Sequence, residues 1–197
     1  MREETLCADN LTFPHSFFEP QEREGFYVSG MMKRYWAAQI KVLSRIAEVC
    51  DRHGIRWFAD CGTLLGAVRH GGYIPWDDDM DICMMREDYM RFAELAEREL
   101  PEGYYIRSTH TNPEHDDILM RVINCNSIVF EEAHLQEYYG CPYAVGVDIF
   151  PLDGLYEDEE KEERRCRRIH MIEEAVGLIA DGAYDQPRCG KLLRDIE

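Results

Sequence analysis

The chain has 197 residues and a formal net charge of −17, and 45% of its residues are hydrophobic. These values are typical of a folded globular protein with a sizeable core and exclude a disordered chain. The acidic balance argues against nucleic acid or an anionic membrane as the main partner, because both require a basic surface. A small phosphorylated substrate stays compatible with this charge, since a metal ion and a few local basic residues can hold it.

The eight cysteines are scattered along the chain and form no CxxC pair. This distribution is typical of reduced thiols in a cytosolic protein and disfavours a zinc knuckle. The first ten residues, MREETLCADN, are polar and acidic and do not resemble a signal peptide. No apolar run approaches the roughly 18 residues that a transmembrane helix needs. We therefore expect a cytoplasmic protein, held peripherally at the inner membrane face if its acceptor is lipid-linked.

Secondary structure is predicted from hydrophobic periodicity and from residues that end helices. Apolar residues at steps of three and four indicate helices, whereas short β-branched and aromatic runs indicate strands. Gly54 and Pro101 are typical of residues that follow a helix. In chain order, the sequence predicts an irregular lead-in over 1–29, a helix over 30–52, a β-prone run over 55–62, a short helix over 63–72, a strand over 79–84, a helix over 86–99, strands over 104–109, 118–124, 127–132 and 144–150, and a helix over 157–180.

These alternating elements predict an α/β (α+β) fold, in which helices flank one sheet. The strand candidates 118–124 and 127–132 are separated by two residues and are expected to pair as a hairpin. The expected division is a central domain over 30–156 and a C-terminal helical segment over 157–197.

The run YIPWDDDMDI, residues 73–82, places four aspartates among apolar residues. On a strand, Asp79 and Asp81 would share one face while Met80 and Ile82 point into the core. Aspartate runs are usually solvated turns, but this run passes directly into the apolar residues ICMM. Turn formation or helix capping is sufficient to explain Asp77 and Asp78.

Two carboxylates at this spacing have Cβ atoms about 6 to 7 Å apart, which lets both reach one divalent cation or two neighbouring ones. Oxygen ligands suit a hard cation such as Mg²⁺ or Mn²⁺. A third acid is expected from a distant strand, and Asp148 in VGVDIF is the best candidate because apolar strand residues flank it. We expect Asp79, Asp81 and Asp148 to be the metal ligands and the catalytic residues.

A small-residue turn precedes the aspartate run. Gly62 permits close approach of a backbone, and Gly62 and Thr63 open a short helix whose amides attract phosphate. A Gly-Thr turn followed by Asp-x-Asp and by a later acid matches the pattern of nucleotidyltransferase folds.

The stretches FADCGTLLGAVRHGGYIPWDDDMDI and VDIFPLDG resemble the LicD family, which is phosphocholine-transferase-like and related to the fukutin-type phosphotransferases. The resemblance runs from about residue 57 to residue 154. It implies a nucleotidyltransferase-like fold with a mixed sheet in the central domain. It also implies transfer of a phosphocholine-like phospho-alcohol from a CDP-activated donor to a glycan or lipid-linked glycan, as in cell-surface glycan modification. Longer members are expected to carry helices beyond this chain's end, so the chain is either truncated or a minimal member.

Two arginines are candidates for phosphate binding. Arg69 either grips a phosphate or is an exposed arginine at a helix end. Arg121, in an apolar strand, requires a carboxylate or phosphate partner, and pairing with an aspartate of the cluster is the favoured interpretation. Core packing is the favoured interpretation for Trp76, with stacking on a base or a cation as the alternative.

Two other functions remain open. One is a nucleotidyltransferase that acts on a small phosphorylated sugar or alcohol through the same acids. The other is a non-catalytic module that binds a nucleotide or a metal ion. The mass of a reaction product would separate the two enzymes, and the absence of binding to any cytidine compound would favour the module.

Overall fold

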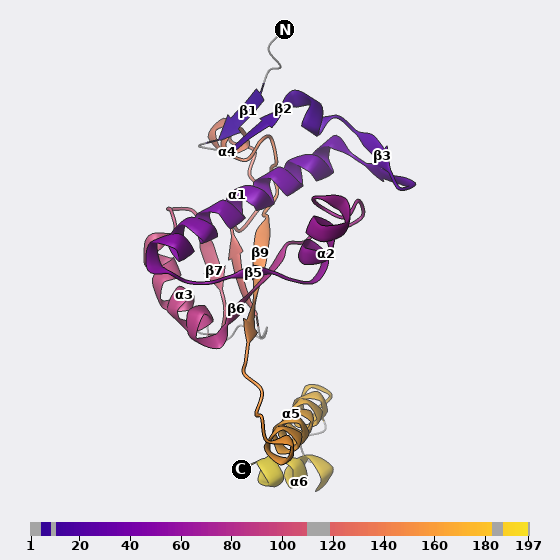
Figure 1. Cartoon of the computed structure of the whole chain (residues 1–197), viewed down its shortest axis with the longest axis vertical. Coiled ribbons are helices and arrows are strands. Elements are labelled where there is room, and N and C mark those ends of the chain that lie inside the picture. The colour runs from indigo at the N-terminus through magenta and orange to yellow at the C-terminus, as the bar shows by residue number, and fades with distance from the viewer. Residues whose placement is uncertain (1–4, 9–10, 110–118, 183–186, 197) are drawn as a thin grey trace. The chain divides into compact units, whose positions relative to one another are not determined.

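The computed structural model describes residues 5–8, 11–109, 119–182 and 187–196 (Figure 1). The chain forms two compact units, Met1–Leu152 and Asp153–Glu197. The first unit includes the N-terminal lead-in and ends at Leu152, whereas the expected central domain ran to residue 156.

The lead-in forms two short hairpins where the sequence predicted irregular chain. Strand β1 (Thr5–Ala8) pairs with β2 (Leu11–Pro14), and β3 (Gln21–Arg23) pairs with β4 (Phe26–Val28), with the 3₁₀ helix η1 (His15–Phe18) between them. The second hairpin turns at Glu24 and Gly25, whose φ angles of 52° and 77° match the twist that a two-residue turn requires. The lead-in packs on the domain through its phenylalanines, and the ring of Phe13 lies 5.1 Å from that of Tyr139.

Helix α1 (Gly30–His53) confirms the long helix predicted from the apolar stripe. Ser29 accepts a hydrogen bond from the Met32 amide at its start, and Gly54 adopts the left-handed conformation at its end with φ 62°. Its buried side is wider than the predicted stripe, because Gln39 and Lys41 are buried as well.

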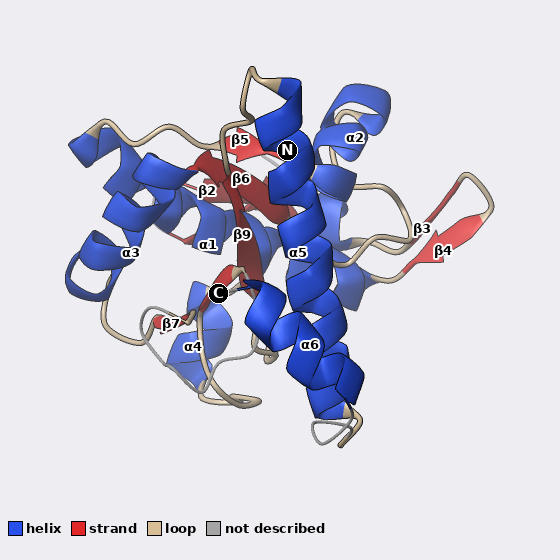
Figure 2. Cartoon of the chain, turned by 90° about the horizontal axis from the view of Figure 1, so that it is seen from below, coloured by secondary structure: helices blue, strands red, loops and turns tan. Residues whose placement is uncertain are grey.

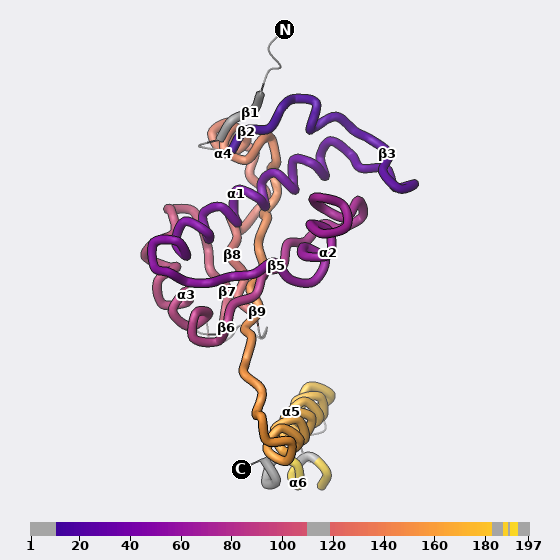
Figure 3. The backbone as a smooth tube through the Cα atoms, viewed as in Figure 1, coloured from indigo at the N-terminus to yellow at the C-terminus, as the bar shows by residue number. Residues whose placement is uncertain are grey.

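The remaining elements of the first unit are β5 (Phe58–Ala59), α2 (Cys61–His70), β6 (Asp81–Met85), α3 (Arg86–Glu99), β7 (Tyr105–Arg107), β8 (Met120–Ile123), α4 (Glu132–Glu137) and β9 (Gly146–Leu152). The strands from β5 onward form one sheet in the order β5-β6-β9-β8-β7. Strands β6 and β9 are parallel, whereas the other pairs are antiparallel (Figure 3). The prediction of a mixed sheet flanked by helices is therefore confirmed.

The predicted hairpin between 118–124 and 127–132 is wrong. Strand β8 pairs with β7 and β9, and residues 127–131 form no strand. Ile128 and Phe130 are 58% and 73% exposed, so this short apolar run has no buried face that would fix it in a sheet. Helix α4, which the sequence reading missed, follows directly.

One face of the sheet packs on helices α1 and α3. Alternate residues of the three central strands point into this core, and each is fully buried: Ile82, Met84, Met120, Val122, Val147 and Ile149. The residues between them point to the opposite face. The opposite face is therefore the one that carries the charged side chains of these strands.

The second unit consists of α5 (Glu159–Ala180) and α6 (Pro187–Ile196), which pack side by side (Figure 2). Asp158 caps α5 by accepting from the Lys161 amide, and Glu162 pairs with Arg165 one turn later. The described helices of the chain include none that combines the length and the apolar character needed to cross a bilayer.

Candidate functional site

A row of charged residues crosses the sheet on the face opposite the core. Asp81 at the start of β6 stands in register with Asp148 of β9, and Asp148 stands in register with Arg121 of β8. Arg107 of β7 continues the row beside Arg121. Residues in register on neighbouring strands point to the same face, so the row runs from acidic to basic across four strands.

Asp81 lies at the acidic end and is only 8% exposed. Burial, with the charges of Asp79, Asp148, Asp77 and Asp60, raises the pKa of its carboxyl from 3.8 to about 6. A bound cation would relieve the repulsion among these carboxylates.

Asp79 lies outside the strand that was predicted to carry it, because β6 begins at Asp81. Burial, together with the neighbouring carboxylates of Asp79 and Asp78, raises the pKa of Asp77 to about 6. Asp77, expected to be a turn or cap residue, is thus part of the acidic cluster.

The carboxylate oxygens of Asp148 both accept hydrogen bonds from Arg121. Arg121 Nε contacts Oδ1, and its Nη2 lies 2.5 Å from Oδ2. This bidentate pair confirms the favoured interpretation of Arg121 as a partner of the cluster. Within the described ranges, no three acid, histidine or cysteine side chains converge closely enough to hold a metal ion as they stand.

Gly62 and Thr63 hold the acids in position. The hydroxyl oxygen of Thr63 accepts a hydrogen bond of 2.8 Å from the amide of Asp81. A Cβ at Gly62 would lie 2.3 Å from Oδ2 of Asp77, so only glycine leaves room for that carboxylate in its present place. Phosphate binding by this turn stays a prediction.

Buried side chains of α1 fix the loop that carries Asp77 and Asp78. Trp36 donates from Nε1 to the carbonyl of Asp77 (2.9 Å), and Gln39 donates from Nε2 to the carbonyl of Asp78 (3.0 Å). Gln39 also donates to the carbonyl of Gly146 at the start of β9 (3.3 Å) and is 1% exposed. Gln39 therefore ties the aspartate loop to the strand of Asp148. Sequence reasoning missed it, and a glutamine inside an apolar helix stripe was the available signal.

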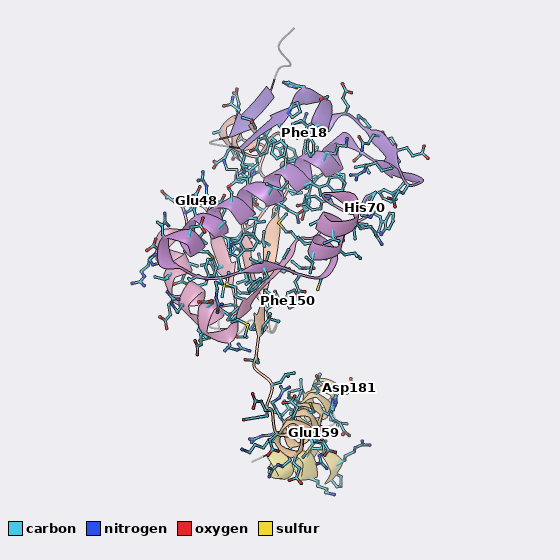
Figure 4. All side chains as sticks on the ribbon, in the orientation of Figure 1. Phe18, Glu48, His70, Phe150, Glu159 and Asp181 are labelled. Carbon is cyan, nitrogen blue, oxygen red and sulfur yellow. The ribbon has the colours of Figure 1, made fainter. Side chains whose placement is uncertain are left out.

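Arg69 lies at the end of α2, and Trp76 lies in the turn between α2 and β6. Arg69 is exposed and donates from Nε to His70 Nε2 at 2.8 Å, while His70 Nδ1 lies 3.0 Å from a Glu24 carboxylate oxygen. Figure 4 labels His70 on the side of the unit that carries the β3–β4 hairpin. Trp76 is 52% exposed, so the favoured prediction of core packing is wrong. Its ring meets Phe26 and His70 edge-on, at 6.4 Å from each. Phosphate binding by Arg69 stays a prediction.

A cavity of about 300 Å³ opens over three members of the charged row, Asp148, Arg121 and Arg107, and Asp81 does not line it. The residues that line it include Asp79 and Asp148 on the acidic side and Arg107 and Arg121 on the basic side. Tyr35 of α1 also lines it, and burial followed by the charge of Asp78 raises the pKa of its phenol. A cavity with carboxylates at one end and guanidinium groups at the other can hold a cation next to a phosphate.

Residues 54–164, more than half of the chain, match the family described as "LicD/FKTN/FKRP, nucleotidyltransferase domain". The chain belongs to this family. The matched segment contains the turn at Gly62 and Thr63, the aspartate run and Asp148, so the predicted resemblance to LicD proteins is confirmed.

Three known proteins share sequence similarity with this LicD-family chain. It is 32% identical over 117 residues to the lipopolysaccharide cholinephosphotransferase LicD of Haemophilus influenzae, covering 59% of this chain and 42% of that protein. It is 40% identical over 82 residues to an uncharacterized protein of Rickettsia typhi, covering 39% and 26%. It is 44% identical over 43 residues to the human ribitol 5-phosphate transferase FKRP, covering 22% and 9%. The match thus spans less than half of each relative.

Proposed function

We propose that this chain is the nucleotidyltransferase-like domain of a metal-dependent transferase, which moves a phospho-alcohol group of the phosphocholine type from a CDP-activated donor to a glycan hydroxyl. The observation that carries the proposal is the row of Asp81, Asp148 and Arg121 across three neighbouring strands. It is supported by the transferase names of the LicD and FKRP relatives. A cytoplasmic location belongs to the same proposal and is supported by six free cysteines among the described side chains.

A divalent cation suits the acidic end of the row. The ligand atoms there are carboxylate oxygens, which Mg²⁺ and Mn²⁺ prefer. Burial, together with the mutual repulsion of these carboxylates, raises the pKa values of Asp77 and Asp81 to about 6. Asp79 and Asp81 would hold the ion, with Asp148 as a further ligand or as the general base. When bound, the ion would neutralise negative charge on the donor's phosphates.

The chain's own residues would supply orientation and proton transfer. Arg121 would face the transferred phosphate while keeping the carboxylate of Asp148 in place, since a guanidinium matches phosphate and carboxylate oxygens alike. Asp148 would accept the proton of the acceptor hydroxyl as that oxygen attacks phosphorus. The new bond joins the acceptor oxygen to phosphorus, the bond from phosphorus to CMP breaks, and CMP leaves with the electron pair.

A donor panel tests the proposal directly. Purified protein would be incubated with CDP-choline, CDP-ribitol or CTP, a set of glycan acceptors and Mg²⁺, and CMP release would be measured with and without EDTA. We expect CMP release that depends on acceptor and is lost with EDTA, together with a product heavier by one phospho-alcohol. A product that carries CMP would replace the proposal with a nucleotidyltransferase. If no cytidine compound is turned over and none stabilises the protein against heat, both enzymatic functions are rejected.

A further inference from the structure

A second cavity, of about 330 Å³, adjoins the cavity over the charged row. It is lined by Ser29, Met31, Met32, Tyr35, Asp78 and Tyr143. Tyr35 and Asp78 also line the first cavity, so these two side chains form a shared wall. A ligand whose phosphate occupies the first cavity can therefore extend past this wall into the second.

We propose that the second cavity is the subsite for the alcohol head group of the donor, and that it selects a positively charged ammonium head over a neutral polyol. The inference rests on the proposed function, because it assigns one end of the donor to the neighbouring site. It goes further in naming the side chains that choose between two kinds of phospho-alcohol.

The lining chemistry favours a cation. Two phenol rings, those of Tyr35 and Tyr143, can present their faces to an ammonium group, and the carboxylate of Asp78 supplies a formal negative charge beside them. The described lining of this cavity contains no lysine, arginine or histidine that would repel such a group. Met31 and Met32 offer polarisable, apolar contacts that suit N-methyl groups.

The same lining offers a neutral polyol less than it offers a cation. Each polyol hydroxyl that enters a cavity loses hydrogen bonds to water and requires a replacement. Ser29, the two tyrosine hydroxyls and the Asp78 carboxylate can supply some of these replacements, whereas Met31 and Met32 supply none. The selectivity thus comes mainly from the attraction of Asp78 and the two rings to a cation, which a neutral polyol does not gain.

The parts of the subsite are fixed by well-packed structure. Tyr35 belongs to α1, and the backbone of Asp78 is held by Gln39 of the same helix at 3.0 Å. Arg107 and Arg121 line the cavity on the other side of the shared wall. An anionic phosphate at the arginines and a cationic head at the tyrosines would therefore be complementary to the two cavities at once.

Binding measurements test the subsite without requiring turnover. Isothermal titration calorimetry would compare phosphocholine with ribitol 5-phosphate on the full 197-residue chain and on the variants Tyr143→Ala, Tyr143→Phe and Asp78→Asn. We expect the wild type to prefer phosphocholine. Because Tyr143 is 41% exposed, Tyr143→Ala should weaken phosphocholine binding by about twofold to thirtyfold, the range from an exposed to a desolvated cation–π contact. Tyr143→Phe keeps the ring and should retain most of the affinity, while Asp78→Asn should weaken phosphocholine and leave ribitol 5-phosphate unchanged.

Tyr27→Ala is the matched control, because Tyr27 is 67% exposed and does not line the cavity. Equal affinity of the wild type for the two phosphates would overturn the inference, as would an unchanged affinity in Tyr143→Ala. The two proposals fail separately. Preferential binding of phosphocholine without any transfer would contradict the proposed function and support the subsite. Transfer from CDP-choline and CDP-ribitol with equal kcat/KM would support the proposed function and contradict the subsite.

Discussion

Asp81 and Asp148 occupy paired positions on two parallel strands, yet their surroundings are opposite. Asp81 is buried beside other carboxylates, which with burial raise its carboxyl pKa to about 6. Asp148 is held by the guanidinium of Arg121 through both oxygens. The same residue type, in the same row of the sheet, therefore lies among like charges on β6 and beside an opposite charge on β9.

This difference suggests a division of roles between the two aspartates. A carboxylate among like charges gains most from a bound cation, whereas a carboxylate in a bidentate pair keeps a defined orientation when no ligand is present. We therefore assign cation binding mainly to the β6 side and orientation of acceptor and phosphate to the β9–β8 side. Four experiments test this contrast.

Replacing Asp81 should have the largest effect on activity. In Asp81→Asn, a carboxylate of the proposed cation site is lost, and CMP release should fall by at least about 100-fold, the size of effect seen when a main electrostatic group is removed. The same change removes one charge from a repelling cluster, so the melting temperature in EDTA at pH 7 should rise. Melting curves and CMP release on one preparation measure both. A lower melting temperature in EDTA would show that Asp81 is stabilising and would contradict the contrast.

Replacing Arg121 should reduce activity by disturbing the β9–β8 side of the row. Arg121→Gln leaves Asp148 without its partner, and activity should fall by about tenfold to a hundredfold as orientation is lost. The loss of stability should be only about 1 kcal/mol, because the Arg121 side chain is 41% exposed and solvent screens the pair. Arg121→Lys keeps the charge but not the bidentate geometry and should stay impaired. Full activity in Arg121→Lys would show that charge alone is sufficient.

Thr63 tests how the acidic side is positioned. Thr63→Val removes the oxygen that accepts from the Asp81 amide, so we expect a loss of about 1 to 2 kcal/mol in the free energy of unfolding. Activity should fall by roughly tenfold if the start of β6 shifts. Thr63→Ser keeps the oxygen and is the matched control in denaturant unfolding and in CMP release. Equal activity of the valine and serine variants would remove Thr63 from the site.

The pH dependence of stability should give the smallest effect. The carboxyl pKa of Asp81 is about 6 in the folded protein and 3.8 ordinarily, so between these values the folded state binds more protons than the unfolded state. The contribution of Asp81 therefore makes the protein less stable as pH rises from about 4 to 6. The melting-temperature difference between Asp81→Asn and wild type in EDTA should grow over this window. A constant difference would show that the Asp81 carboxyl has an ordinary pKa.

Several elements could be predicted because their signals are local. Helix α3 begins and ends where periodicity and Pro101 indicated, and α1 ends one residue beyond its predicted range, before Gly54. The strand candidates over 118–124 and 127–132 were both short apolar runs, and only the first became a strand. Short runs carry too little periodicity to separate strands from exposed loops, and the difference was decided by which run β9 could pair with.

Local sequence patterns alone predicted helices α1, α2 and α3, the class of the fold and the family, because periodicity, helix caps and motif spacing are encoded within short stretches. The folded structure was needed to show that Asp81 stands in register with Asp148, that Arg121 binds both oxygens of Asp148, and that Gln39 ties the aspartate loop to β9. These contacts join segments far apart in the chain. They depend on strand register and on burial, which arise only when the whole sheet closes over its core.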